Sequence, residues 1–226
     1  MYILLILLLI IFIFFREIFF EKINSLKYYE FGKDHPRICF LAGVHGNESA
    51  GTITLYKMLP TFPHILKKKK GSLLVIPCAN PWGFLNNSRY QKNFSDINRN
   101  FSSKCRDFTS CNILRLVRDC DLVVDFHEGW SFHKINPRSI GSTISYTPGA
   151  RLLAEKILER LNNHISDPKK KFTLLNDNCR IPTSLQCRLK DKNYILIETS
   201  GQNNIQPLPI RVYQIELIID TILKFM

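Results

Sequence analysis

The 226-residue sequence is poor in glycine and proline, with 10 and 11 residues, and has no Cys-x-x-Cys pair. The scarcity of glycine and proline excludes collagen-like and low-complexity proteins. The missing cysteine pairs argue against a zinc-finger framework, and the lack of any internal repeat argues against a solenoid. Hydrophobic residues make up 45% of the chain and charged residues 22%. This composition supports a folded core and excludes disorder over the whole length.

Positive charge exceeds negative charge by a formal net +12. Two lysine runs, 67–70 and 169–171, supply seven of these charges, and each run lies in a candidate turn between apolar segments. Such runs could form a patch for nucleic acid or for an anionic membrane. No aromatic side chains are interleaved with the lysines, as a base-stacking surface would require. We therefore favour solvated loops and expect no specific nucleic-acid partner.

The seven cysteines leave the redox state of the chain open. Cys39 lies beside Phe40 and Leu41, which is typical of a buried core thiol. In an oxidising compartment, Cys105 could pair with Cys111, or Cys179 with Cys187.

The N-terminal segment predicts a membrane anchor. Residues 2–15 are all apolar or aromatic, and a helix continued through Arg16 and Glu17 to Phe20 is about 28 Å long, near the thickness of a bilayer core. A cleavable signal peptide is the alternative, but the segment lacks a basic start and a small-x-small cleavage site. We expect residues 1–25 to form an uncleaved single-pass transmembrane helix and its juxtamembrane segment.

The charges around this span indicate its orientation. Arg16, Lys22 and Lys27 follow the span, and no basic side chain precedes it, so the positive-inside rule predicts a cytoplasmic catalytic domain. Four Asn-x-Ser sequons fall in segments that we expect to form the active site, where a glycan would be disruptive. These sequons begin at Asn47, Asn86, Asn93 and Asn100.

Residues 26–226 alternate between apolar strand patterns and amphipathic helix patterns. We expect an α/β domain with a mostly parallel mixed sheet and helices on both faces. In such folds, ligands bind at the carboxyl ends of the strands. The expected strands are 37–43, 72–77, 122–126 and 194–197; the helices are 49–59, 112–120, 150–165 and 209–225; and long irregular segments cover 80–103 and 130–147.

Two strand ends carry candidate metal ligands. His45 and Glu48 follow the first expected strand, and His127 follows the strand 122–126. Two imidazoles and one carboxylate suit zinc and leave a fourth position open, as in catalytic rather than structural sites. Each residue alone would more simply be a structural histidine or a surface glutamate. Glu128 would point to the opposite side of the strand, so we do not count it as a ligand.

Further polar groups fall at the same edge. Arg89, Asn98 and Arg99 lie in the irregular segment 80–103 and could bind an anion, because guanidinium groups match carboxylates. A solvated basic loop is the alternative. Glu198 follows the strand 194–197 and could act as a general base beside a metal; otherwise it is a surface residue at a strand exit.

Taken together and in this order, the motifs resemble those of the M14 superfamily of zinc carboxypeptidases, including its murein-peptide peptidases and its succinylglutamate desuccinylase and aspartoacylase branch. The similarity runs from residue 43 to residue 200. Its motifs are His45-Gly-Asn-Glu48-Ser, Asn80-Pro-Trp-Gly83, Asp96-Ile-Asn-Arg-Asn-Phe101 with Arg89 seven residues earlier, Asp125-Phe-His127-Glu-Gly129 and Ile197-Glu198.

The resemblance implies a role for each matching residue. His45, Glu48 and His127 would bind one zinc ion. Glu198 would be the general base and then the acid. Arg89 would polarise the scissile carbonyl, Asn98 and Arg99 would hold a substrate carboxylate, and Asp96 would orient a ligand histidine.

The predicted function is therefore a zinc-dependent hydrolase that cleaves an amide bond next to a carboxylate-bearing residue of a peptide. The chain departs from the family pattern at Gln91 and Phe94, and segment 176–192 has no substrate-capping tyrosine. These departures leave open an N-acyl amino acid deacylase of the succinylglutamate desuccinylase or aspartoacylase type. A catalytically inert, membrane-tethered binding module is the third alternative.

Overall fold

The structure is a computed structural model that describes residues 26–102, 104, 107–176, 179 and 181–226. The anchor predicted for residues 1–25 lies outside this part of the chain. Within the described ranges, no helix combines the length and apolarity needed to cross a membrane.

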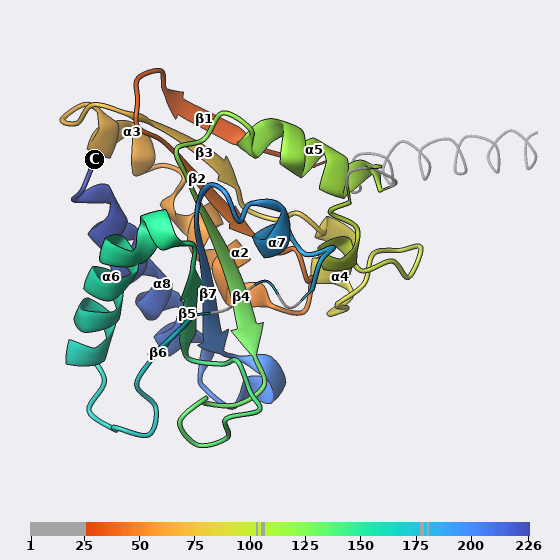
Figure 1. Ribbon diagram of the computed structural model, residues 1–226, viewed down its shortest axis with the longest axis vertical. Helices are drawn as coiled ribbons and strands as arrows, with labels where there is room; N and C mark the ends of the chain where they lie inside the picture. The colour runs from red at the N-terminus through yellow and green to blue at the C-terminus, as the bar shows by residue number, and fades with distance from the viewer. Residues whose placement is uncertain (1–25, 103, 105–106, 177–178, 180) are drawn as a thin grey trace, which may run out of the picture.

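The described residues form a seven-stranded mixed sheet with the order β1-β3-β2-β4-β7-β5-β6 (Figure 1). The four central strands, β3, β2, β4 and β7, run parallel. At the two sides, β1 is antiparallel to β3 and β5 is antiparallel to β7. The strand bounds are β1 Tyr29–Gly32, β2 Arg37–Ala42, β3 Ser72–Ile76, β4 Leu122–Gly129, β5 Thr143–Tyr146, β6 Thr173–Leu175 and β7 Asn193–Ser200.

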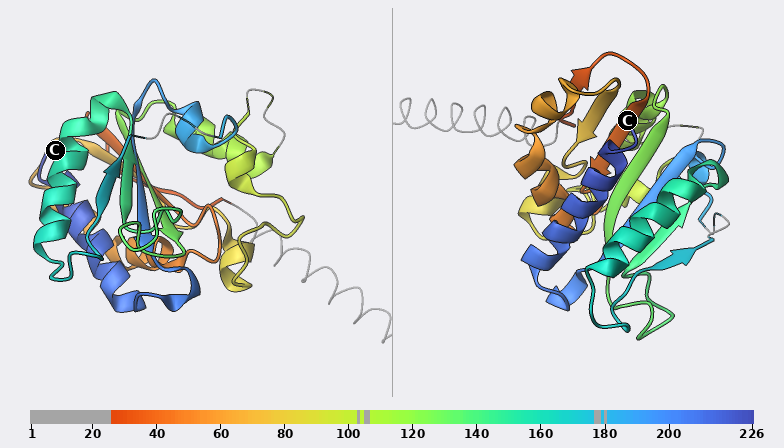
Figure 2. Two further views of the ribbon diagram at one scale, coloured as in Figure 1. Left: turned by 60° about the horizontal axis from the view of Figure 1, so that its bottom comes forward. Right: turned by 90° about the vertical axis from the view of Figure 1, so that its left-hand side faces the viewer.

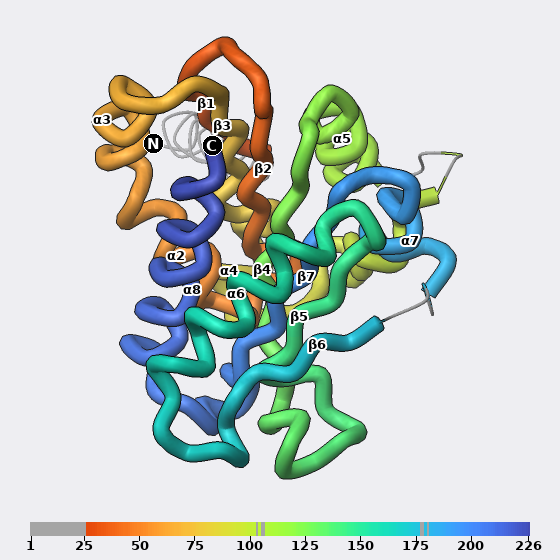
Figure 3. Tube along the Cα trace, turned by 60° about the vertical axis from the view of Figure 1, so that its left-hand side comes forward, coloured from red at the N-terminus to blue at the C-terminus, as the bar shows by residue number. Residues whose placement is uncertain are grey.

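Helices cover both faces of the sheet, as the alternating pattern predicts. Helices α6 and α8 lie on one face and α5 and α7 on the other (Figures 1 and 2). Figure 3 shows α6 and α8 side by side along the first face. The helix bounds are α2 Ser49–Met58, α3 Phe62–Leu66, α4 Pro81–Leu85, η1 Ile97–Arg99, α5 Phe108–Val117, η2 Pro148–Ala150, α6 Arg151–Asn163, α7 Leu185–Arg188, η3 Gln202–Asn204 and α8 Leu208–Leu223.

The central strand β4 divides the core into two parts because its side chains alternate between the faces. Val124 and Phe126 belong to the core cluster that packs against α6 and α8. Val123 belongs to the second cluster, which includes residues of α5 and the neighbourhood of α7. Asp125 and His127 share the parity of Val123. The site therefore lies on the face that carries the smaller core.

Several element boundaries differ from those expected. The predicted strand 122–126 continues to Gly129, which places His127 on β4 rather than after it. The helix predicted from residue 112 begins at Phe108, because the Asp107 side chain accepts a hydrogen bond from Ser110 N and caps the helix. The irregular segment 130–147 contains β5. Both lysine runs lie in turns, as expected.

The long segment 80–103 also contains short helices. Asn80 caps α4, its side chain accepting a hydrogen bond from Gly83 N, and Pro81 occupies the first helical turn. Asp96 caps η1 by accepting a hydrogen bond from Asn98 N. Both caps are interactions between residues two or three positions apart. The polar composition of the segment predicts a loop and does not reveal these short helices.

Candidate metal centre and active site

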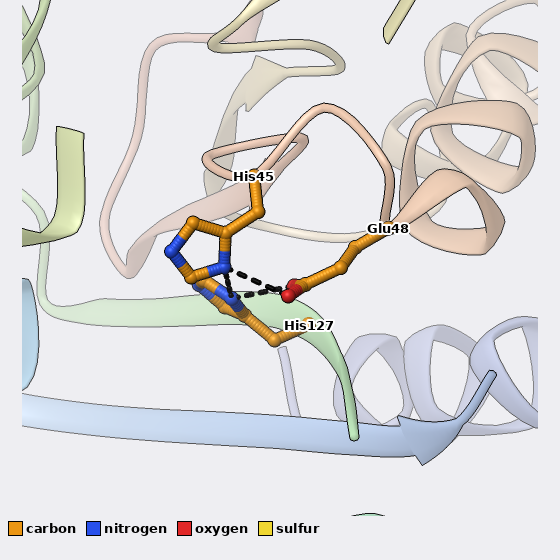
Figure 4. A group of neighbouring side chains, drawn as sticks. All are labelled: His45, Glu48 and His127. Carbon is orange, nitrogen blue, oxygen red and sulfur yellow. Dashed lines mark hydrogen bonds and ion pairs between the residues drawn. The ribbon is translucent and has the colours of Figure 1, made fainter. Parts of the chain in front are cut away.

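The three predicted metal ligands meet at one point (Figure 4). His45 and Glu48 come from the turn between β2 and α2, and His127 comes from β4. Glu48 Oε1 lies 2.8 Å from His45 Nδ1, and Glu48 Oε2 lies 2.8 Å from His127 Nδ1. The two Nδ1 atoms are 3.0 Å apart. All three side chains are at most 5% exposed.

Two glycines shape the turn that holds His45 and Glu48. Gly43 has a φ of +67°, and a Cβ there would lie 2.6 Å from Thr52 Oγ1. Gly46 packs against the backbone of Gly83, where a Cβ would lie only 2.0 Å from the Gly83 carbonyl carbon. The segment that begins at Asn80 therefore supports the turn beneath the ligands.

Each ligand histidine has a carboxylate behind it. His127 Nε2 lies 3.2 Å from Asp125 Oδ2, and His45 Nε2 lies 3.4 Å from Asp96 Oδ1. Both distances are within the range of ion pairs, but neither Nε2 atom is aligned for a hydrogen bond with its carboxylate. The Tyr194 hydroxyl donates to Asp125 Oδ2 at 2.9 Å. Carboxylates on the far nitrogens orient both rings so that the Nδ1 atoms face each other, the arrangement of histidines that ligate metals.

The donor set fits a zinc ion. Two imidazole nitrogens and a carboxylate converge with separations of 2.8–3.0 Å, near the roughly 3.3 Å between neighbouring ligands of a tetrahedral zinc. Burial opposes ionisation of Glu48, but His45 and His127 outweigh it and hold the pKa of Glu48 well below its usual range. An anionic carboxylate between two imidazoles is a binding site for a divalent cation.

Glu198 lies beside this cluster on the neighbouring strand. The register of β4 and β7 pairs it directly with His127, and the side chain is 5% exposed. Its Oε2 atom is buried and has no hydrogen-bond partner among the described residues. Burial raises the pKa of Glu198 well above its ordinary value, although His127 opposes the shift. A carboxylate in this state is suited to accept and return a proton.

Arg89 reaches the ligand cluster from the loop after α4. Its Nη1 lies 3.2 Å from His45 Nδ1 and 3.7 Å from Glu48 Oε1. Its Nε donates to Asp96 Oδ2 at 3.0 Å, which fixes the guanidinium. Asn80 Nδ2 donates to Tyr90 O at 3.0 Å and holds the backbone beside Arg89.

A cavity of about 220 Å³ connects these groups. It is lined by six of the seven predicted site residues, and the seventh, His127, is the strand partner of Glu198. The Asn98 side chain is held by Leu185 N, which donates to its Oδ1 at 3.1 Å, and Arg99 is exposed at the wall. The six lining residues are His45, Glu48, Arg89, Asn98, Arg99 and Glu198.

Sequence reasoning missed Gln202, which follows β7. Its Nε2 donates to Glu128 O at 2.7 Å and lies 3.3 Å from Glu48 Oε1. The Glu128 side chain faces away from the ligands, as its strand position predicts, and pairs with buried Arg211. It also accepts a hydrogen bond from Ala50 N at the start of α2. Nothing in the local pattern around Gln202 signals its contact with a residue 154 positions earlier.

Comparison with known proteins gives a family match for about half of the chain. The sequence model of the succinylglutamate desuccinylase/aspartoacylase catalytic domain matches residues 34–139, a span that holds every predicted site residue except Glu198. A search of curated proteins finds no match.

Solved structures share the fold. Product-bound Csd4, a cell shape determinant protein of Helicobacter pylori, has a TM-score of 0.71 and 21% identity over 89% of this chain and 55% of its own. Its mDAP-bound form, described as a D,L-carboxypeptidase, gives 0.67 and 21% over 84% and 50%. A metallopeptidase candidate from Shewanella amazonensis SB2B gives 0.63 and 19% over 84% and 76%.

The chain therefore spans about half the length of the Csd4 chains and has their mixed α/β fold. The resemblance to the M14 zinc carboxypeptidase superfamily, expected from the order of its motifs, is confirmed.

Proposed function

We propose that this chain is a zinc-dependent hydrolase that cleaves an amide bond next to a carboxylate-bearing residue. One observation carries the proposal: the buried cluster of His45, Glu48 and His127 lies beside Arg89 and Glu198, whose Oε2 atom has no hydrogen-bond partner among the residues that the structure describes. Ligands, a proton acceptor and a fixed cation at one cavity are the parts that metal-assisted hydrolysis needs.

The metal would be held by Nδ1 of both histidines and by the Glu48 carboxylate. When bound there, zinc supplies Lewis acidity that activates water and polarises a carbonyl. The backbone N–H of Glu128 donates to Glu48 Oε2 at 3.1 Å and keeps the carboxylate turned toward the histidines.

Glu198 and Arg89 perform the remaining chemistry. Oε2 of Glu198 takes a proton from the attacking water and returns it to the leaving amine. The guanidinium of Arg89, anchored on Asp96, donates to the oxygen of the scissile carbonyl as charge develops there. One such donor commonly contributes a factor of about 10²–10³ in rate.

Arg99 and Asn98 bind the carboxylate of the substrate. Both line the cavity: Arg99 Nη1 donates to the backbone carbonyl of Asn98 at 2.9 Å, and the Asn98 side chain accepts from Leu185 N at 3.1 Å. A guanidinium fork matches a carboxylate and prefers substrates with a free carboxylate over their amides.

An N-acyl amino acid deacylase is the second candidate, and the match to the desuccinylase/aspartoacylase catalytic domain favours it. The same residues would act in both reactions. The two candidate functions differ in the acyl side of the scissile amide. A carboxypeptidase substrate has a peptide there, whereas a deacylase substrate has a simple acyl group.

Metal analysis followed by a substrate panel tests the proposal. The chain should bind about one zinc ion, and His45→Ala or His127→Ala should remove it. The panel compares a peptide with a free carboxyl terminus, its amide and N-acyl amino acids. Full zinc occupancy in both variants would refute the metal site. Zinc binding without turnover of any substrate would instead favour an inert binding module.

A further inference from the structure

Strands β7, β5 and β6 form the floor of the cavity beyond the candidate metal ligands, and their register decides which side chains lie next to one another. Side chains two residues apart on a strand share a face. In the row that holds the ligands, His127 pairs with Glu198, which pairs with Thr143. In the adjacent row, Leu196 pairs with Ser145, which pairs with Leu175 of β6. The sheet therefore continues from the reacting groups onto a surface of small hydroxyl and aliphatic side chains.

Two leucines of this second row are partly exposed, which shows that the row reaches the surface of the cavity. Leu196 is half-buried although its neighbours Ile195 and Ile197 on β7 are fully buried. Leu175 is half-buried as well. Both leucines line the cavity.

The opposite wall comes from the segment before and within α7. Ile181, Ser184 and Gln186 line the cavity. A disulfide between Cys179 and Cys187 closes this segment, and Phe101 N donates to Thr183 O at 3.0 Å. The wall is thus tied to the loop that carries Asn98 and Arg99.

None of the five residues proposed below for the subsite is charged: Leu175, Leu196, Ile181, Ser145 and Gln186. Among the described residues that line the cavity, the charged side chains are the metal-site residues, Arg99 and Glu128, and the Glu128 carboxylate is engaged by Ala50 N and Arg211. Two hydroxyls that line the cavity are engaged as well. Thr143 donates to Ile140 O, and Tyr194 donates to Asp125. A charged group entering here would lose its hydration without gaining a partner.

We infer that Leu175, Leu196, Ile181, Ser145 and Gln186 form a specificity subsite for an uncharged, aliphatic side chain on the carboxylate-bearing residue of the substrate. The inference rests on the proposed function, since it places that carboxylate on Arg99. The cavity of about 220 Å³ must also hold the scissile amide beside the candidate metal ligands, which limits the subsite to a side chain of moderate size.

The test uses the full chain, purified in detergent and loaded with zinc. We would measure kcat/KM for acyl-glycyl dipeptides that end in leucine, aspartate or lysine, and for the N-acetyl derivatives of the same three amino acids. Leucine should exceed both charged residues by about tenfold or more. Comparable turnover of all three, or a preference for a charged residue, would overturn the subsite and leave the hydrolase standing.

Two variants test whether the subsite residues cause the preference for leucine over charged residues. Gln186→Glu keeps the volume of a half-exposed side chain and should raise the lysine-to-leucine ratio about threefold to fivefold. Ser145→Asp places a carboxylate on the floor and should raise that ratio further. Ser166→Asp, an exposed position outside the cavity, is the control and should leave the ratio unchanged. An unchanged ratio in Gln186→Glu would count against the assigned wall.

Absence of turnover for every substrate would refute the proposed function but not end the test. Binding of N-acetyl-leucine, N-acetyl-aspartate and Nα-acetyl-lysine would then be compared by calorimetry. Tighter binding of the leucine derivative would support the subsite, and equal or weaker binding would overturn it.

Discussion

At the scale of single residues, the two oxygens of Glu48 determine how the site is organised. Oε1 faces His45 and Gln202, and Oε2 faces His127 and the backbone N–H of Glu128. The carboxylate is thus held between imidazoles and fixed donors. Residues that touch this carboxylate are expected to affect metal binding. Glu198, whose Oε2 atom has no hydrogen-bond partner in the described part of the chain, is expected to affect turnover alone.

Glu198→Gln tests the proton acceptor. The substitution preserves volume and removes only the ability to take a proton, so zinc should stay bound while kcat falls by about 10²–10⁴. Metal content and steady-state kinetics measure the two effects. Glu159→Gln, an exposed change on α6, is the control. Near-normal rates in Glu198→Gln would show that this residue merely ends a strand.

Gln202→Leu tests whether Gln202 helps to hold the candidate ligand Glu48 in place. The change removes the donor to Glu48 and to Glu128 O at similar volume, and loss of such a contact weakens metal affinity by about 10–100-fold. Competition with a chelator measures the zinc affinity. Asn163→Ala, an exposed change on α6, should leave it unchanged. Wild-type affinity in Gln202→Leu would remove this residue from the site.

At the scale of elements, a buried ion pair and one hydrogen bond to it connect β4, α8 and α2 behind the candidate metal centre. Glu128 on β4 pairs with Arg211 on α8 and accepts from Ala50 N at the start of α2. Both side chains of the pair are at most 3% exposed. Because α2 directly follows Glu48, this contact holds the ligand turn against the sheet.

Arg211→Leu should destabilise the fold. Removing one partner leaves the Glu128 carboxylate buried without its counter-charge, and such losses lower the free energy of unfolding by about 3–5 kcal/mol. Urea denaturation measures the change. Arg151→Leu breaks the exposed pair with Glu155 and should change stability by no more than about 0.5 kcal/mol. Equal effects of the two variants would show that the buried pair has no special role.

At the scale of the whole molecule, we propose that residues 1–20 anchor the protein in a membrane. The apolar run predicts that the full chain stays in the membrane fraction after a carbonate wash, and that deletion of residues 1–25 releases it. Immunoblots of the two fractions measure this. A mature chain beginning beyond residue 20 would instead show a cleaved signal peptide.

The side of the membrane on which the domain lies is a separate question. Basic residues after the span predict the cytoplasmic side. The Cys179–Cys187 disulfide favours the opposite, since disulfides persist in oxidising compartments. Protease protection of intact vesicles, with alkylation of thiols before lysis, distinguishes the two placements. In right-side-out vesicles, a protected domain with alkylated Cys179 and Cys187 would establish the cytoplasmic placement.

Local sequence patterns determined much of this protein. Continuous apolar runs specified β2, β3, β4 and β7, because strands buried on both faces carry few polar residues. Polar residues at the ends of these strands identified every candidate ligand. Parallel strands bring their carboxyl ends to one edge, so His45, Glu48, His127 and Glu198 could be placed together from order alone.

Only the tertiary structure decided the contacts that depend on register and on distant packing. Gln202 reaches Glu48, Arg211 reaches Glu128, and Ser145 and Leu175 complete a floor beside Leu196. None of these pairs is linked by a local motif. Periodicity shows which face a side chain occupies, but it does not show which distant strand lies beside it. The convergence of the candidate ligands and the proposed general base could therefore be predicted from the sequence, whereas the other walls of the cavity could not.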